Sequence, residues 1–171
     1  ELPKEQGRGE IKVKKVMSVV LAGLVGLIGL AGIATAADET KQKVVYHVNG
    51  DDPKQQTGAL RNIQNHINAV GKENLDLRVV MHGNGVSMVL LPDALDKVKG
   101  FKSANASPQM QATIDGLKDQ GVQFKVCANT LTTRKVDMDN DLYMVEQADI
   151  VPSGVAELGI LQAQGYAYIK P

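Results

Sequence analysis

The chain has 171 residues and a balanced formal charge, with 19 Lys and Arg against 19 Asp and Glu. This length fits one domain of ordinary size. The even charge excludes the clustered basic face of a nucleic-acid-binding protein, so no nucleic-acid partner is predicted. The single cysteine excludes a scaffold held together by disulfides within the chain.

An uncharged segment fills residues 16–37, and its centre, residues 19–33, is almost entirely apolar. Lysines precede this segment, and it closes with Ala34-Thr35-Ala36, the small-residue pattern that signal peptidase cleaves. The pattern predicts an upstream segment and signal peptide over 1–36, cleaved after Ala36. The remaining 37–171 is predicted to be a single periplasmic domain.

An uncleaved membrane anchor is the alternative for this segment, because the uncharged run approaches the roughly 20 residues of a spanning helix. Its many glycines favour cleavage, since glycine weakens a permanent helix. Any contact with a membrane is therefore expected only through the signal segment, if it stays uncleaved.

Beyond residue 40, β-branched runs alternate with helical patterns. One helix opens at Asp52-Pro53 and stops at Gly71, and a second opens at Ser107-Pro108 and closes at Gly121. A third helix follows Ser153-Gly154. The runs predict strands at 43–49, 75–81, 122–127, 148–151 and 166–169.

Two connecting segments are less regular. Residues 86–95 are apolar but broken by Pro92, which predicts a short helix or an irregular stretch. Residues 130–143 are polar and predict a turn or a short helix. The alternation as a whole predicts an α/β fold, a three-layer sandwich with a mainly parallel five-stranded sheet and helices on both faces.

In open parallel sheets, ligands bind beyond the carboxyl ends of the strands. Polar residues and glycines follow four of the predicted strands at this edge. The candidate pocket residues are therefore Asn49, His82, Gly83, Asn84, Asn129 and Ser153, grouped around Cys127.

Cys127 is the candidate centre, because a thiol at a strand end can reach solvent and be activated by a helix N-terminus or a nearby cation. The alternative is a buried cysteine that packs as a small apolar residue. His82 could carry a proton beside the thiol or only shape a turn. Ser153 could hold an anion at a helix start or simply cap the helix.

Other familiar sites are missing from the sequence, which lacks G-x-G-x-x-G, G-x-S-x-G, C-x-x-C and H-E-x-x-H. His47 and His66 are predicted to be structural or surface residues. Residues 137–148 begin like a calcium loop, but Leu142 and Ala148 stand where Gly and Glu are needed. No metal and no cofactor are predicted.

Four segments in this order resemble the DsrE/DsrF-like family. Family members have a compact α/β fold, commonly form trimers or hexamers, and include proteins that pass sulfur as a cysteine persulfide. The resemblance implies that Cys127 carries the sulfur, with Asn49, His82 and Asn129 as polar supports. The matching segments are 44–48, 79–86, 122–130 and 151–168.

The sequence thus predicts a periplasmic sulfur-handling protein, a persulfide carrier or sulfurtransferase-like protein that forms homo-oligomers. The resemblance names neither the sulfur donor nor the acceptor. The alternative is a non-enzymatic small-ligand-binding or assembly module of the same fold with a structural cysteine. A rhodanese-type enzyme is the third possibility, but the glycine- and arginine-containing loop around its cysteine is missing.

Overall fold

The computed structural model describes residues 41–171. Its sheet has five strands in the order β4-β3-β2-β1-β5, and every neighbouring pair is parallel. The predicted α/β class and five-stranded sheet are confirmed, and the sheet is parallel throughout. The strands are β1 (Gln42–Val48), β2 (Leu75–Met81), β3 (Gln123–Cys127), β4 (Ile150–Val151) and β5 (Ala167–Ile169).

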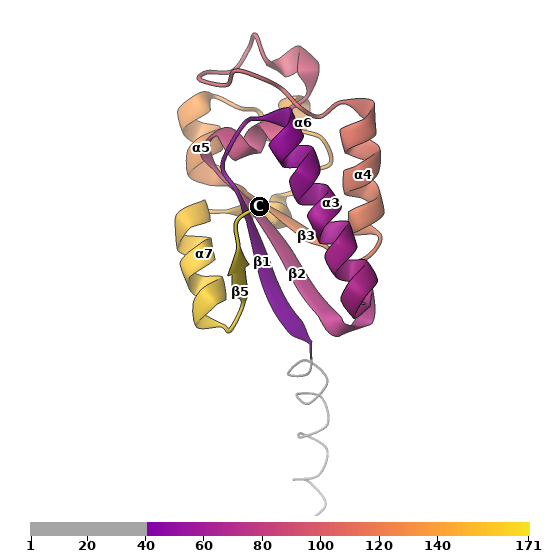
Figure 1. The fold of residues 1–171 in the computed structure, drawn as a ribbon. Coiled ribbons are helices and arrows are strands. Elements are labelled where there is room, and N and C mark those ends of the chain that lie inside the picture. Colours follow the sequence, from indigo (N-terminus) through magenta and orange to yellow (C-terminus); the bar gives the residue numbers. More distant parts are fainter. Residues whose placement is uncertain (1–40) are drawn as a thin grey trace, which may run out of the picture. The chain divides into compact units, whose positions relative to one another are not determined.

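Helices cover both faces of the sheet, with α3 and α4 on one side and α7 on the other (Figure 1). The α-helices are α3 (Pro53–Val70), α4 (Pro108–Lys118), α5 (Ala128–Arg134), α6 (Met138–Asp141) and α7 (Gly154–Ala163). Short 3₁₀ helices complete the connections at Lys72–Asn74, Gly83–Met88, Pro92–Ala94 and Gln147–Asp149.

The larger core lies between the sheet and the pair α3 and α4. Alternation along β1 sends Val44, Tyr46 and Val48 into this core, while Val45 faces the other way. Both helices start as their caps predict. Asp52 accepts the N–H of Gln55 at 2.8 Å, and Ser107 caps α4.

A smaller core lies under α7. It consists of Val45 and Val80 from the sheet, Leu158 and Leu161 from the helix, and Tyr166 before β5. Only one side of α7 takes part in it, because Val155 and Ile160 are 67% and 51% exposed. The helix therefore carries apolar side chains on both its inner and its outer side.

The two irregular segments resolve into short helices. Residues 83–88 and 92–94 form 3₁₀ turns, which fits the short-helix alternative for the segment broken by Pro92. No loop follows β3, because α5 begins directly after Cys127. The reason is that Cys127 itself takes the extended N-cap conformation, so no loop residue is needed.

Within residues 41–171, none of the helices has the length and apolar character needed to cross a membrane. The predicted signal peptide and its cleavage after Ala36 lie outside the described residues.

Candidate functional site

Cys127 and His82 lie side by side at the carboxyl edge of the sheet. Met81 of β2 and Val126 of β3 are partners in the parallel register, and both belong to the larger core. Because side chains alternate along a strand, the next residues, His82 and Cys127, point to the opposite face, toward α7. The two predicted site residues are thus brought together by strand register.

Gly154, the first residue of α7, packs against this edge of the sheet. A Cβ atom added to Gly154 would lie 2.8 Å from Cβ of His82 and 3.3 Å from Cβ of Cys127. The first of these distances is shorter than any ordinary contact between carbon atoms. Only glycine therefore allows the start of α7 to approach the histidine and the cysteine together.

Hydrogen bonds favour the thiolate form of Cys127. Burial, which leaves the residue 5% exposed, raises the pKa of its thiol. Hydrogen bonds from the backbone of Gly154, from Thr130 and from the backbone of Asn129 outweigh burial, so the pKa lies below its ordinary value. The sulfur is held between the first residues of two helices.

Thr130 adjoins both residues of this site. Its hydroxyl oxygen accepts the backbone N–H of Gly83 at 2.9 Å, and hydrogen bonding from Thr130 contributes to the lowered pKa of the Cys127 thiol. Thr130 thereby ties the turn after β2 to the cysteine at the end of β3.

A second histidine, His47 of β1, adjoins His82. Their Nε2 atoms are 2.7 Å apart and the rings stack with centroids 4.7 Å apart. The other ring nitrogen of His47, Nδ1, lies 2.6 Å from the hydroxyl oxygen of Tyr168. A row of polar side chains in contact therefore runs from Tyr168 of β5 through His47 of β1 to His82, the residue after β2.

Both histidines are held in the neutral form. Burial, followed by His82 and Lys170, lowers the pKa of His47 to about 4. Burial and then Lys170 lower the pKa of His82 as well. Near neutral pH each ring therefore has one N–H donor and one bare acceptor nitrogen.

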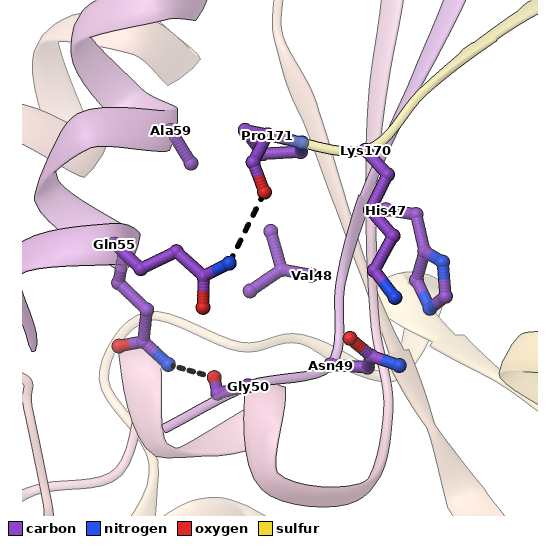
Figure 2. A pocket seen from close by; sticks show the side chains of 9 residues that line it. His47, Val48, Asn49, Gly50, Gln55, Ala59, Lys170 and Pro171 are labelled. Carbon is purple, nitrogen blue, oxygen red and sulfur yellow. Dashed lines mark hydrogen bonds between the residues drawn. The ribbon is translucent and has the colours of Figure 1, made fainter. Parts of the chain in front are cut away.

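Two pockets meet at His47. The first, which we call the α7 pocket, is open, has a volume of about 440 Å³, and is lined by His47, His82, Val155, Leu158, Gly159, Gln162 and Tyr168. The second, the α3 pocket, lies at the end of β1. Figure 2 shows the polar ends of Lys170 and Asn49 near the ring of His47, and Gln55 donating to the carbonyl oxygen of Pro171 at 3.2 Å.

The remaining predicted pocket residues separate into three groups. Asn49 lines the α3 pocket, and Gly83 and Asn129 take part through their backbone N–H groups. The side chain of Asn84 turns away and accepts a hydrogen bond from Arg134 at 2.6 Å. Ser153 caps α7 by accepting the N–H of Ala156 at 3.4 Å, which matches its capping alternative.

Sequence reasoning missed His47, Tyr168, Thr130 and Lys170 as members of this site. The alternation of β1 contained a usable signal, because it sets His47 on the same face as Val45. Tyr168 could not be placed in that way, since its neighbour depends on β5 pairing with β1.

No cluster of three or more His, Cys, Asp or Glu side chains that could hold a metal occurs within residues 41–171. In the segment that resembles a calcium loop, residues 137–148, two of the acidic side chains bond to backbone N–H groups of the same segment. Asp137 caps α6, and the carboxylate of Asp141 accepts the backbone N–H of Asp137 at 2.8 Å.

The fold and the site define a parallel α/β protein with a buried free cysteine at the carboxyl edge of its sheet. The family model described as DsrE/DsrF-like family matches residues 42–171, and the chain belongs to this family. The resemblance noted in the sequence is confirmed at this level.

Two solved structures are similar to the chain. One is a protein of unknown function, MTH1491 from Methanobacterium thermoautotrophicum, with 27% identity and a TM-score of 0.60 over 77% of this chain and 100% of that one. The other is the ychN protein from E. coli, with 19% identity and a TM-score of 0.54 over 76% and 99% of the respective chains, a likeness of fold alone. A search of the curated proteins found no match.

Proposed function

We propose that the protein handles sulfur by carrying a sulfane sulfur atom as a persulfide on Cys127. The observation that carries this proposal is the position of Cys127 at the end of β3, against the first residue of α7. Hydrogen bonding from Gly154, Thr130 and Asn129 lowers the pKa of its thiol there. A thiolate is the nucleophile in exchange at sulfur, and these donors stabilise it. Membership of the DsrE/DsrF-like family suggests the same sulfur-relay chemistry.

Loading and unloading are two exchanges of the same type. In loading, the Cys127 thiolate attacks the outer sulfur of a donor persulfide. A bond forms to Cys127 Sγ, the donor's S–S bond breaks, and its electron pair leaves with the donor thiolate. In unloading, an acceptor thiolate attacks the outer sulfur on Cys127, and the electron pair of the broken bond returns to Cys127 Sγ. Neither exchange has a net requirement for an oxidant.

The experiment is intact-mass measurement of the native protein after incubation with inorganic polysulfide. We expect an increase of one sulfur atom that is removed by a reducing thiol. The matched control is Cys127→Ser, which keeps the size of the side chain and should show no increase. An unchanged mass in the wild-type protein, or an equal increase in the serine variant, would reject persulfide carrying.

The second candidate function is a small-ligand-binding or assembly module in which Cys127 is packed. The 5% exposure of this residue favours it. Titration with a thiol reagent separates the two functions. Carriage of sulfur requires a thiol that reacts in the native protein, whereas a packed cysteine reacts only after unfolding.

We also propose export to the periplasm, supported by the lysine-led apolar segment and by Ala34-Thr35-Ala36. Expression of the full chain with fractionation and N-terminal sequencing tests this. A periplasmic product that begins at Ala37 is expected, and a full-length product in the cytoplasm would contradict export.

We propose further that the chain forms homo-oligomers, supported by the exposed apolar side chains Val155 and Ile160 on α7. Trimers or hexamers are the assemblies that the family resemblance implies. Analytical ultracentrifugation tests this, and a monomer throughout the micromolar range would contradict it.

A further inference from the structure

The row Tyr168, His47 and His82 is an unbroken chain of groups that both donate and accept protons. The contacts are 2.6 Å between the Tyr168 hydroxyl and Nδ1 of His47, and 2.7 Å between the two Nε2 atoms. Tyr168 is 42% exposed and lines the open α7 pocket. The other end, His82, lies beside Cys127 across Gly154.

Two neutral arrangements of protons satisfy these contacts. In the first, Tyr168 donates to Nδ1 of His47, Nε2–H of His47 donates to His82, and the proton of His82 sits on Nδ1. In the second, Nε2–H of His82 donates to His47, Nδ1–H of His47 donates to the Tyr168 oxygen, and Nδ1 of His82 is bare. The second becomes the first when one proton enters at Nδ1 of His82, the two shared protons move one place along the row, and the Tyr168 hydroxyl loses its own proton.

Nδ1 of His82 is the free end of the row. It has no hydrogen-bond partner within the described residues, and His82 lines the α7 pocket. In the second arrangement this nitrogen is free to take a proton from a group that approaches His82. The first arrangement then results after a proton has left the Tyr168 hydroxyl for solvent and the others have moved one place.

We propose that His82, His47 and Tyr168 form a proton relay that carries protons between solvent and the sulfur exchange at Cys127. This rests on the proposed sulfur-handling function. His82 is the residue that meets the reacting group, whereas His47 and Tyr168 act through it as positioning residues.

The proton balance of unloading shows what the relay does. An acceptor that arrives as a thiol gives its proton to Nδ1 of His82 and becomes the attacking thiolate. It forms an S–S bond with the outer sulfur on Cys127, and the bond to Cys127 Sγ breaks with its electron pair on Sγ. One proton leaves through the Tyr168 hydroxyl. In loading, the relay runs in reverse and protonates the leaving donor thiolate.

The charges around the row suit transfer between neutral rings. Lys170, the residue after β5, lowers the pKa of both histidines, and Cys127 is the ionisable neighbour at the end of β3. The sole titratable residue of α7 is Glu157, which is not among the residues that line the α7 pocket. A neutral histidine pair can pass a proton without holding a buried positive charge.

Tyr168→Phe tests the relay, because it removes the hydroxyl and keeps the ring. The matched control is Tyr46→Phe, which removes another tyrosine hydroxyl bonded to a histidine, His66, at 3.1 Å. We load Cys127 with polysulfide and measure sulfur transfer to 2-mercaptoethanol from pH 6 to pH 10. The final extent of loading should be equal in the wild type and both variants, because the shortened polysulfide leaves as a stable anion and needs no proton from the relay.

Transfer by Tyr168→Phe should be slower than wild type by at least about tenfold near neutral pH. The deficit should disappear above the pKa of 2-mercaptoethanol, because the acceptor thiolate then brings no proton. Tyr46→Phe should match wild type throughout. A Tyr168→Phe profile that equals wild type, or a deficit that is constant with pH, would overturn the relay.

A second measurement does not depend on sulfur chemistry. The ¹⁵N shifts of the histidine rings report which nitrogen carries the proton. In Tyr168→Phe, the ring shifts of both His47 and His82 should change, since the loss of one contact resets the whole row. Unchanged His82 shifts would overturn the relay. Failure of wild-type loading would instead reject the sulfur-handling function, so the two proposals fail separately.

Discussion

Gly154, the first residue of α7, lies against Cys127 at the end of β3, and hydrogen bonding from its backbone lowers the pKa of the thiol. The same glycine lies against His82. The position of one helix therefore sets both the acidity of the thiol and its separation from the nearest proton carrier.

Gly154→Ala should push α7 away from the sheet, because its Cβ would lie 2.8 Å from Cβ of His82. We expect a loss of about 1–3 kcal/mol in the free energy of unfolding. The pKa of Cys127 should rise because its hydrogen bond from residue 154 lengthens. Urea unfolding and the pH dependence of iodoacetamide alkylation measure the two effects.

Gly159→Ala is the control on the same helix, since nothing lies within 4 Å of the Cβ it would add. It should leave the alkylation profile unchanged and stabilise α7 by up to about 1 kcal/mol. Equal alkylation profiles for Gly154→Ala and wild type would show that the start of α7 does not control the thiol.

Thr130→Val should raise the pKa of Cys127, because the hydroxyl that bonds the sulfur is lost. It should also cost about 1–3 kcal/mol of stability, since the N–H of Gly83 loses its acceptor. Thr130→Ser retains the hydroxyl and should keep a profile close to wild type. The readout is the alkylation rate as a function of pH. Equal profiles for Thr130→Val and Thr130→Ser would show that the Thr130 hydroxyl does not affect the pKa of Cys127.

Acid should destabilise the protein through its neutral histidines. The pKa of His47 is lowered from 6.5 to about 4 in the folded state. Between these two values the unfolded chain binds more protons than the native one, so stability falls as pH decreases from about 6.5 through 4. The melting temperature measured across this window should fall toward acid.

His47→Gln removes the titrating group and should flatten that part of the curve. Its melting temperature should depend less on pH than that of wild type between about 4 and 6.5. A variant curve parallel to the wild-type curve over the whole window would contradict the neutral state of His47.

Ile160→Lys should weaken self-association, because it places a charge on the exposed apolar side of α7, where Ile160 is 51% exposed. The stability of the single chain should change by no more than about 0.5 kcal/mol, as for most surface substitutions. Sedimentation velocity compares it with Gln164→Lys, which adds the same charge at an exposed polar position. Equal sedimentation of both variants and the wild type would contradict the assignment of α7 to the subunit interface.

The local features of this protein were predictable from the sequence, but the partners of its side chains were not. The bounds of β2 follow directly from a β-branched run between turn signals, and Gly71 and Gly165 end their helices with positive φ. The placement of Cys127 opposite Val126 follows from strand alternation. Each of these depends on neighbours within a few residues.

His47 was predicted to be structural because its contact depends on two long-range facts. The first is that β1 lies next to β2, and the second is that β5 joins the sheet on the other side of β1. The sequence contains no pattern that orders parallel strands, since each crossover passes through a helix. The role of Gly154 was hidden for the same reason, because its close neighbours belong to β2 and β3.

The row of side chains across the sheet has a consequence for biosynthesis. His47 is separated by 35 residues from His82 and by 121 residues from Tyr168, so no short stretch of the nascent chain contains the site. The ribosome adds the cysteine before the tyrosine. Until β5 docks beside β1, a newly made chain has the Cys127 thiol in place but lacks the contact between His47 and the Tyr168 hydroxyl. A chain truncated before residue 167 would never form this contact.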